Sequence, residues 1–154
     1  MRKIGKDVVL IVLLAAVLAA GSYLLRPDAL KLVPDDSVQG MADGNDPFQV
    51  IAIDRARELF VNGQALFADA RPVFAYDAGH IKGAVNLDPT SMDQWATKII
   101  DNYPIDRPII TYCEGAQCTL SHELAEQLTS FGYEEVYYMI DGWGQWKAQG
   151  LPVE

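Results

Sequence analysis

The only two thiols of the chain, Cys113 and Cys118, stand at the two ends of the stretch CEGAQC. The apolar run PIITY precedes this stretch, and a segment with helical spacing of its apolar residues follows it. A thiolate between a strand and a helix N-terminus lies among backbone N–H groups and near the positive end of the helix dipole, which lowers a thiol pKa. Gly115 and Ala116 are small enough for the backbone to curl around the sulfur. The position of the loop alone fits a nucleophilic Cys113 and a merely buried cysteine equally well.

Two other chemistries use the same loop. A phosphatase-like site needs an arginine six residues after the nucleophile, but Thr119 stands there and no arginine follows Arg107, which excludes it. A metal site could draw on both cysteines and His122, with His80 as the one speculative fourth ligand. Because that set is incomplete, we expect neither a metal nor another cofactor.

A disulfide between Cys113 and Cys118 is sterically conceivable across the four residues that separate them. It could be a resting state, a step in which a second thiol resolves an intermediate, or a structural staple. The spacing does not choose among these three.

Predicted strands and helices alternate from residue 48 onward, and these elements must position the cysteine loop. We expect strands over 50–53, 65–69, 83–87, 108–112 and 136–140, and helices over 55–62, 73–78, 92–102, the segment after the loop and 142–150. Asp54 is the expected N-cap of the first helix, and Met92, Trp95, Ile99 and Ile100 are expected on one apolar face. Such alternation predicts an α/β fold, a parallel sheet with helices on both faces. Ligands of such sheets bind beyond the carboxyl ends of the strands, where the cysteine loop lies.

An uncharged stretch of 18 residues, 8–25, precedes this domain. As a helix it would span about 27 Å, close to the hydrocarbon thickness of a bilayer. Three cations lie before it and two after it among aspartates, which predicts a cytoplasmic N-terminus and an exported domain. We therefore expect a transmembrane anchor or signal segment over 1–25, a flexible linker over 26–47, and the domain over 48–154. The expected location is the cell (inner) membrane with a periplasmic domain, or the periplasm or the outside if the segment is cleaved.

The charge of the chain is −9, which argues against nucleic acid as a partner because phosphates are bound by basic surfaces. Residues 47–154 hold seven Lys and Arg against fifteen Asp and Glu, so the domain itself carries a charge of −8. An anionic ligand therefore meets like charge.

Four blocks in order resemble the rhodanese (sulfurtransferase) family. They are DAR (69–71), YDAGHIKGAVNL (76–87), YCEGAQCTLSHELAEQLTSFGY (112–133) and DGWGQWKAQGLPV (141–153). The resemblance covers residues 49–154, about two thirds of the chain. It implies a single rhodanese domain, in which the loop cysteine accepts sulfane sulfur as a persulfide and passes it to a thiol or another nucleophile.

The resemblance also implies roles for the neighbours of Cys113. Arg71 would lie near the loop, where it could pair with Asp69 or attract an anionic donor. The backbone amides of the substrate-binding loop would cradle the outer sulfur; they belong to Glu114, Gly115, Ala116, Gln117, Cys118 and Thr119.

Two positions depart from the family pattern. Cys118 stands where the family commonly closes the loop with arginine or threonine, and Glu114 stands where many members carry a cation. Both changes remove positive charge beside the sulfur, so thiosulfate should bind less well than a persulfide, a polysulfide or a protein donor. Cys118 could attack the Cys113 persulfide, release sulfide and leave a disulfide, which then needs a thiol reductant. A non-catalytic sulfur-carrier or binding module and a dithiol redox module remain alternatives.

Overall fold

The computed structural model describes residue 14 and residues 47–154. All elements described below belong to the unit Val38–Glu154. The expected membrane or signal segment (1–25, apart from Leu14) and the expected linker (26–47, apart from Pro47) lie outside the described residues. Within the described part of the chain, no helix is long and apolar enough to cross a membrane.

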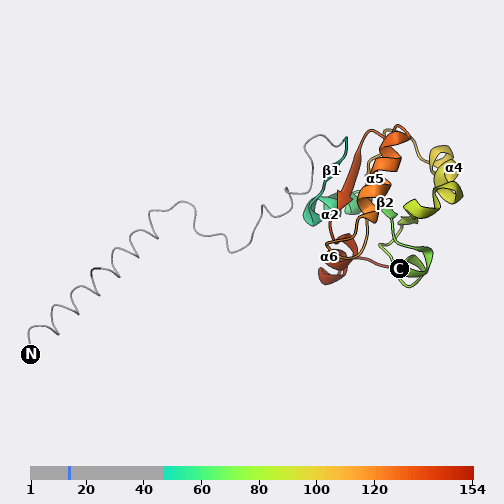
Figure 1. The fold of residues 1–154 in the computed structure, drawn as a ribbon. Helices are drawn as coiled ribbons and strands as arrows, with labels where there is room; N and C mark the ends of the chain where they lie inside the picture. Colours follow the sequence, from blue (N-terminus) through green and yellow to red (C-terminus); the bar gives the residue numbers. More distant parts are fainter. Residues whose placement is uncertain (1–13, 15–46) are drawn as a thin grey trace, which may run out of the picture. The chain divides into compact units, whose positions relative to one another are not determined.

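Five parallel strands form one sheet, which confirms the expected α/β class (Figure 1). The strands are β1 (Gln49–Val50), β2 (Leu66–Asp69), β3 (Val85–Asn86), β4 (Ile109–Tyr112) and β5 (Val136–Met139). Their order across the sheet is β1-β5-β4-β2-β3. Every residue of β2 and β4 is buried, as expected of central parallel strands covered on both faces.

Helices cover both faces of this sheet, as the alternation predicts (Figure 1). The helical segments are α2 (Ile53–Val61), α3 (Val73–Asp77), the 3₁₀ turn η1 (Pro89–Ser91), α4 (Met92–Asn102), α5 (Leu120–Ser130) and α6 (Gly142–Ala148). One core cluster joins the sheet to α4 and α5 through Trp95, Ile99 and Leu124. The second joins the sheet to α2 and α6 through Leu59 and Trp146.

Two expectations about the helices are wrong. Helix α2 begins at Ile53 with Ala52 as its N-cap, so Asp54 lies in the first turn, where its charge still favours the helix dipole. In α4 only part of the expected face is buried, because Met92 is 41% and Ile100 52% exposed. The residues that do face the sheet lie four positions apart, so the buried stripe of this helix is narrower than the apolar pattern suggests.

The strand order reverses beside β4, and this reversal places the site. From β4 the chain crosses to β5 on one side, whereas β2 pairs with β3 on the other. Asp69, the last residue of β2, lies opposite Tyr112, the last residue of β4. The loops that carry Arg71 and Cys113 therefore leave the sheet side by side, at a topological switch point.

Candidate active site

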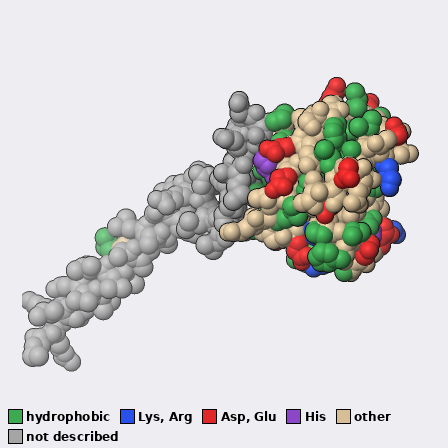
Figure 2. Space-filling model, turned by 45° about the vertical axis from the view of Figure 1, so that its right-hand side comes forward, with side chains coloured by type: hydrophobic (Ala, Val, Ile, Leu, Met, Phe, Trp, Pro, Cys, Tyr) green, Lys and Arg blue, Asp and Glu red, His purple; other side chains and the backbone are tan. Residues whose placement is uncertain are grey.

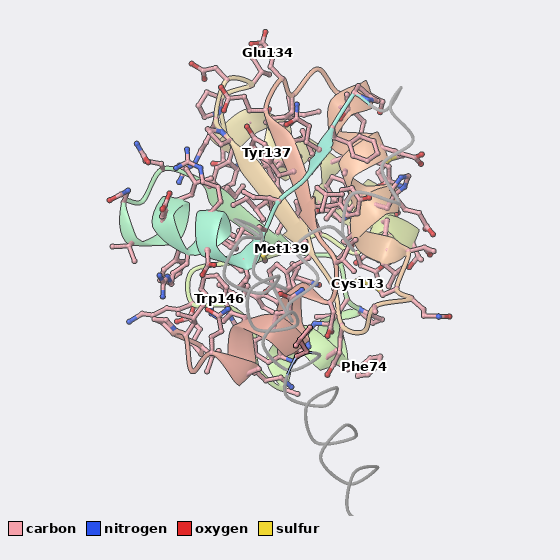
Figure 3. The ribbon with its side chains drawn as sticks, turned by 90° about the vertical axis from the view of Figure 1, so that its left-hand side faces the viewer. Phe74, Cys113, Glu134, Tyr137, Met139 and Trp146 are labelled. Carbon is pink, nitrogen blue, oxygen red and sulfur yellow. A yellow bond between two sulfur atoms is a disulfide. The ribbon has the colours of Figure 1, made fainter. Side chains whose placement is uncertain are left out.

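Cys113 directly follows β4 and is fully buried, whereas Glu114, Gly115, Ala116 and Gln117 are exposed. Figure 3 shows Cys113 toward the same end of the domain as Phe74, with Glu134 at the other end. The loop closes on itself through a hydrogen bond from the Cys118 N–H to the Gly115 carbonyl, 3.1 Å long. Gly115 has a φ of +89°, a conformation that glycine adopts without strain.

The two cysteines are joined as a disulfide, with their Cα atoms 6.4 Å apart. Cys118 is only half-buried, so the two sulfurs differ in access. The disulfide that the spacing left open is therefore present in this form of the protein.

Ser121 is a neighbour of the nucleophile position that the sequence interpretation missed. Its Oγ lies 3.4 Å from the Cys113 Sγ, and Ser121 itself is buried. The Ser121 carbonyl accepts a 2.7 Å hydrogen bond from the hydroxyl of Thr111 in β4, which ties the first turn of α5 to the strand. A hydroxyl in this place can donate to a Cys113 thiolate. The signal in the sequence is a serine in the first turn of the helix that follows the cysteine.

Asp69 and Arg71 form a buried ion pair beside the loop. The Asp69 carboxylate accepts hydrogen bonds from the Arg71 backbone N–H (2.9 Å), Nε (3.0 Å) and Nη2 (2.7 Å). Arg71 Nη2 also donates to the Gly79 carbonyl at 2.7 Å. Burial lowers the pKa of Arg71, but the hydrogen bonds and charge of Asp69 outweigh it, so the pKa is raised and the side chain stays cationic. Of the two roles expected for Arg71, pairing with Asp69 is the one that this structure contains.

Glu114 contacts two cations, one of which the sequence interpretation missed. Its carboxylate lies 3.5 Å from Arg71 Nη1 and 3.6 Å from Lys147 Nζ of α6. Both cations also face the ring of Trp143, with Arg71 Cζ 4.5 Å and Lys147 Nζ 4.8 Å from its centroid. These residues and Phe74 line a hollow of about 400 Å³ next to the Glu114 end of the loop. Positive charge is thus present beside the loop, but the carboxylate of Glu114 already neutralises part of it.

Asp141, the N-cap residue of α6, is hydrogen-bonded to the cysteine loop although it lies 26 residues beyond Gly115 in the sequence. Its Oδ1 accepts a 2.7 Å hydrogen bond from the Gly115 N–H. Asp141 has a φ of +47°, and no other residue except glycine in the described part of the chain has a positive φ. Such a backbone conformation is uncommon outside glycine and is frequent at functional sites. In this disulfide form the amides of Gly115 and Cys118 are engaged within the protein, so the expected amide cradle around sulfur stays a prediction for the reduced loop.

A second hollow, of about 500 Å³, lies at the Cys118 end of the loop. We call it the Cys118 pocket. It is lined by Ala116, Gln117, Cys118, Thr119, Ser121, His122, Tyr138 and Ile140. It shares no lining residue with the hollow beside Glu114.

The two histidines considered as metal ligands have other neighbours. His80 stacks on Tyr76 with ring centroids 3.7 Å apart and lies 3.4 Å from the Glu154 carboxylate. His122 packs edge-on against Phe48 at 4.9 Å. Within residues 47–154, no group of three or more His, Cys, Asp or Glu side chains is arranged to hold a metal ion.

This combination defines a class: a parallel α/β domain with a cysteine loop between a central strand and the next helix. The chain belongs to the rhodanese-like domain family, which it matches over residues 52–149. The thiosulfate sulfurtransferase GlpE of Actinobacillus succinogenes is 29% identical over 107 residues, which cover 70% of this chain and 91% of that protein. GlpE of Vibrio cholerae is 28% identical and covers 71% and 97%. At the level of the family, the chain is therefore of the sulfurtransferase type.

Other similarities show that the domain occurs in different contexts. The HTH-type transcriptional regulator Rv0324 of Mycobacterium tuberculosis is 33% identical over 92 residues, which are 60% of this chain but only 38% of the regulator. Among solved structures, the BH2092 protein of Bacillus halodurans superposes with a TM-score of 0.61 at 24% identity, over 69% of this chain and 76% of that one, and supports the fold alone. The Alr3790 protein of Anabaena has a TM-score of 0.55 at 27% identity, over 66% and 79%.

Proposed function

We propose that this chain is a sulfurtransferase in which Cys113 accepts sulfane sulfur as a persulfide and passes it to a thiol or another nucleophile. The observation that carries the proposal is the place of Cys113 at the carboxyl end of β4, before the N-terminus of α5 and 3.4 Å from the Ser121 hydroxyl. Backbone dipoles and a hydroxyl donor both stabilise a thiolate there. Membership of a family with thiosulfate sulfurtransferases among its members supports it.

In the proposed reaction, the Cys113 thiolate attacks the sulfane sulfur of a donor. The bond between that sulfur and the rest of the donor breaks, and the donor leaves with the electron pair. An acceptor thiolate then attacks the outer sulfur and regenerates Cys113. Alternatively, Cys118 attacks the Cys113 Sγ, hydrosulfide leaves, and the disulfide forms. Two external thiols then reduce this disulfide, so the proposed partners are a small-molecule or protein sulfur donor and acceptor, and a thiol reductant.

The experiment is to reduce the full-length protein, remove the reductant, add a sulfane donor and measure the intact mass. We expect the mass to rise by one sulfur atom, or a disulfide to form with release of sulfide. Cys113→Ser should show neither change. Cys118→Ser should keep the added sulfur but release no sulfide without an external acceptor. If the wild type and Cys113→Ser behave identically, the proposal fails.

A dithiol redox module is the second candidate, and the disulfide between Cys113 and Cys118 favours it. Its test uses the same reduced protein without any sulfur donor. Reversible disulfide formation with a glutathione redox buffer, together with no gain of sulfur from donors, would replace the first proposal by this one.

We also propose that segment 1–25 attaches the domain to the inner membrane with the domain on the exported side, as its length and flanking charges suggest. Cell fractionation after alkaline carbonate washing tests the attachment, and protease accessibility in spheroplasts tests the side. Release of the chain by carbonate, or protection of the domain in spheroplasts, contradicts this proposal.

A further inference from the structure

The two sulfurs of the disulfide are unequally accessible. Cys113 Sγ belongs to a residue with 0% exposure, and it lies against the Ser121 hydroxyl at 3.4 Å and the Cys118 carbonyl at 3.5 Å. Cys118 is half-buried and lines the Cys118 pocket of about 500 Å³. Thiol–disulfide exchange requires an attacking thiolate to reach one sulfur, so access alone favours Cys118.

The leaving group points to the same choice. When a thiolate attacks one sulfur of a disulfide, the other sulfur departs with the electron pair, and the more stable thiolate departs faster. As a leaving group, the Cys113 thiolate lies next to the Ser121 hydroxyl and on the N-terminal side of the 11-residue helix α5. Both features stabilise negative charge on its sulfur. Attack on Cys118 therefore expels the better leaving group, whereas attack on Cys113 requires entry into the core.

From these two observations we propose that the Cys118 pocket binds a low-molecular-weight thiol, which reduces the enzyme by attacking Cys118 alone. The inference rests on the part of the proposed function in which the disulfide forms and must be reduced. The volume of the pocket lies in the range of about 300–1,000 Å³ that small-molecule sites occupy. None of its lining side chains is an Asp, Glu, Lys or Arg, so the pocket suits a thiol whose body carries no charge.

The exchange takes two steps. The thiolate of the small thiol bonds to Cys118 Sγ, the bond between the two protein sulfurs breaks, and Cys113 leaves as a thiolate. A second small thiolate attacks the non-protein sulfur of the mixed disulfide and releases the Cys118 thiolate. Two small thiols are oxidised to one disulfide, and the protein disulfide is reduced. Cys113 thus becomes free in the first step, while Cys118 is still blocked.

The two ends of the cysteine loop border two different hollows. The hollow lined by Arg71, Phe74, Trp143 and Lys147 lies at the Glu114 end and shares no lining residue with the Cys118 pocket. The reductant uses the Cys118 end.

The first test maps the mixed disulfide in the oxidised full-length wild type. The protein is mixed with 2-mercaptoethanol in the presence of iodoacetamide, digested, and analysed by mass spectrometry at several iodoacetamide concentrations. We expect mercaptoethanol on Cys118 and the carbamidomethyl group on Cys113 about ten times as often as the reverse. Equal labelling of the two cysteines, or mercaptoethanol mainly on Cys113, overturns the proposal.

A matched pair of variants tests the pocket. Ala116→Phe fills the Cys118 pocket, whereas Ala78→Phe places the same ring on an exposed residue that lines the other hollow. We expect Ala116→Phe to slow reduction of the disulfide by 2-mercaptoethanol by about tenfold, and Ala78→Phe to change it by less than about twofold. Equal rates for both variants overturn the pocket assignment.

These outcomes are independent of sulfur transfer. Attack at Cys118 is measured without any sulfur donor, so it can be found in a protein that never gains sulfur; then the proposed function fails and the assignment of the pocket stands. A protein that gains sulfur at Cys113 but is reduced by attack on Cys113 gives the opposite result.

Discussion

Replacing Asp69 by alanine should destabilise the domain strongly, because it removes the buried counterion of Arg71 and leaves only the exposed Glu114 carboxylate at 3.5 Å. Asp69 is 0% and Arg71 5% exposed, and the carboxylate accepts hydrogen bonds from the backbone N–H, Nε and Nη2 of Arg71. Arginine keeps its proton at every accessible pH even without a partner, so in Asp69→Ala the buried guanidinium stays charged. Removing one partner of such a pair costs about 3–5 kcal/mol of unfolding free energy.

The measurement is urea denaturation of the full-length chain at neutral pH, followed by circular dichroism. With a slope of about 1–3 kcal/mol per M of urea, the midpoint should fall by more than about 1 M. Glu58→Ala is the matched control, because it breaks an exposed pair with Arg55 whose side chains are 62% and 59% exposed. That loss should stay below about 1 kcal/mol. If Asp69→Ala costs no more than Glu58→Ala, the reasoning about this ion pair is refuted.

Three further predictions follow from the site. Because burial raises the pKa of Tyr112 above its ordinary value of 10, wild-type stability should be complete below about pH 10 and fall above it. Tyr112→Phe should reduce this alkaline loss in urea denaturation, and a part should remain because burial also raises the pKa of Tyr76 and of Tyr133. An unchanged pH profile contradicts the prediction. Glu114→Gln removes a negative charge beside the reduced loop, so it should raise the rate with an anionic methanethiosulfonate about threefold relative to the rate with an uncharged one. Glu134→Gln, at the opposite end of the domain, should leave this ratio unchanged (Figure 3). In a Cys118→Ser background, Ser121→Ala should slow the alkylation of Cys113 about threefold to tenfold, because it removes a hydrogen bond to the thiolate. An unchanged alkylation rate contradicts this prediction.

The sequence predicted the fold class and most elements because their apolar periods are clear. The run PIITY and the helix after the cysteine loop appear at 109–112 and 120–130, close to where the pattern put them. The strand order β1-β5-β4-β2-β3 was not predicted, because periodicity does not say on which side a strand pairs. The exposure of Met92 and Ile100 was missed for a related reason: the pattern gives the apolar side chains of a helix but not the rotation with which it docks.

The sequence located the parts of the candidate site that lie close to the loop and left out those that tertiary packing brings to it. The pairing of Asp69 with Arg71 is local, and a resemblance to a known block marked it. Lys147 and Asp141 approach the loop from 33 and 26 residues further along the chain. Their approach depends on how α6 docks beneath the sheet, and no local pattern records that.

The surface of the domain is acidic, and its negative charge affects which ligands approach the site. Asp and Glu side chains are spread widely over the face drawn in Figure 2, where Lys and Arg side chains are few, in keeping with the charge of −8 over residues 47–154. A dianion approaching the loop meets this field before it meets the hollow. Uncharged ligands do not, and the uncharged low-molecular-weight thiol proposed for the Cys118 pocket meets this requirement.

The electrical neighbours of Cys113 therefore differ from those of a nucleophile that is activated by free cations. Arg71 is held by Asp69 and by the Gly79 carbonyl, and Glu114 lies against both Arg71 and Lys147. What remains to stabilise a thiolate is neutral: the Ser121 hydroxyl and the N-terminal dipole of α5. Neutral dipoles act at short range and are screened little by salt when they are buried, whereas steering by exposed charges falls off within about 10 Å at 0.1 M salt. The reactivity of this loop should therefore follow from hydrogen bonds at the sulfur itself, and the acidic surface should select which donors reach it.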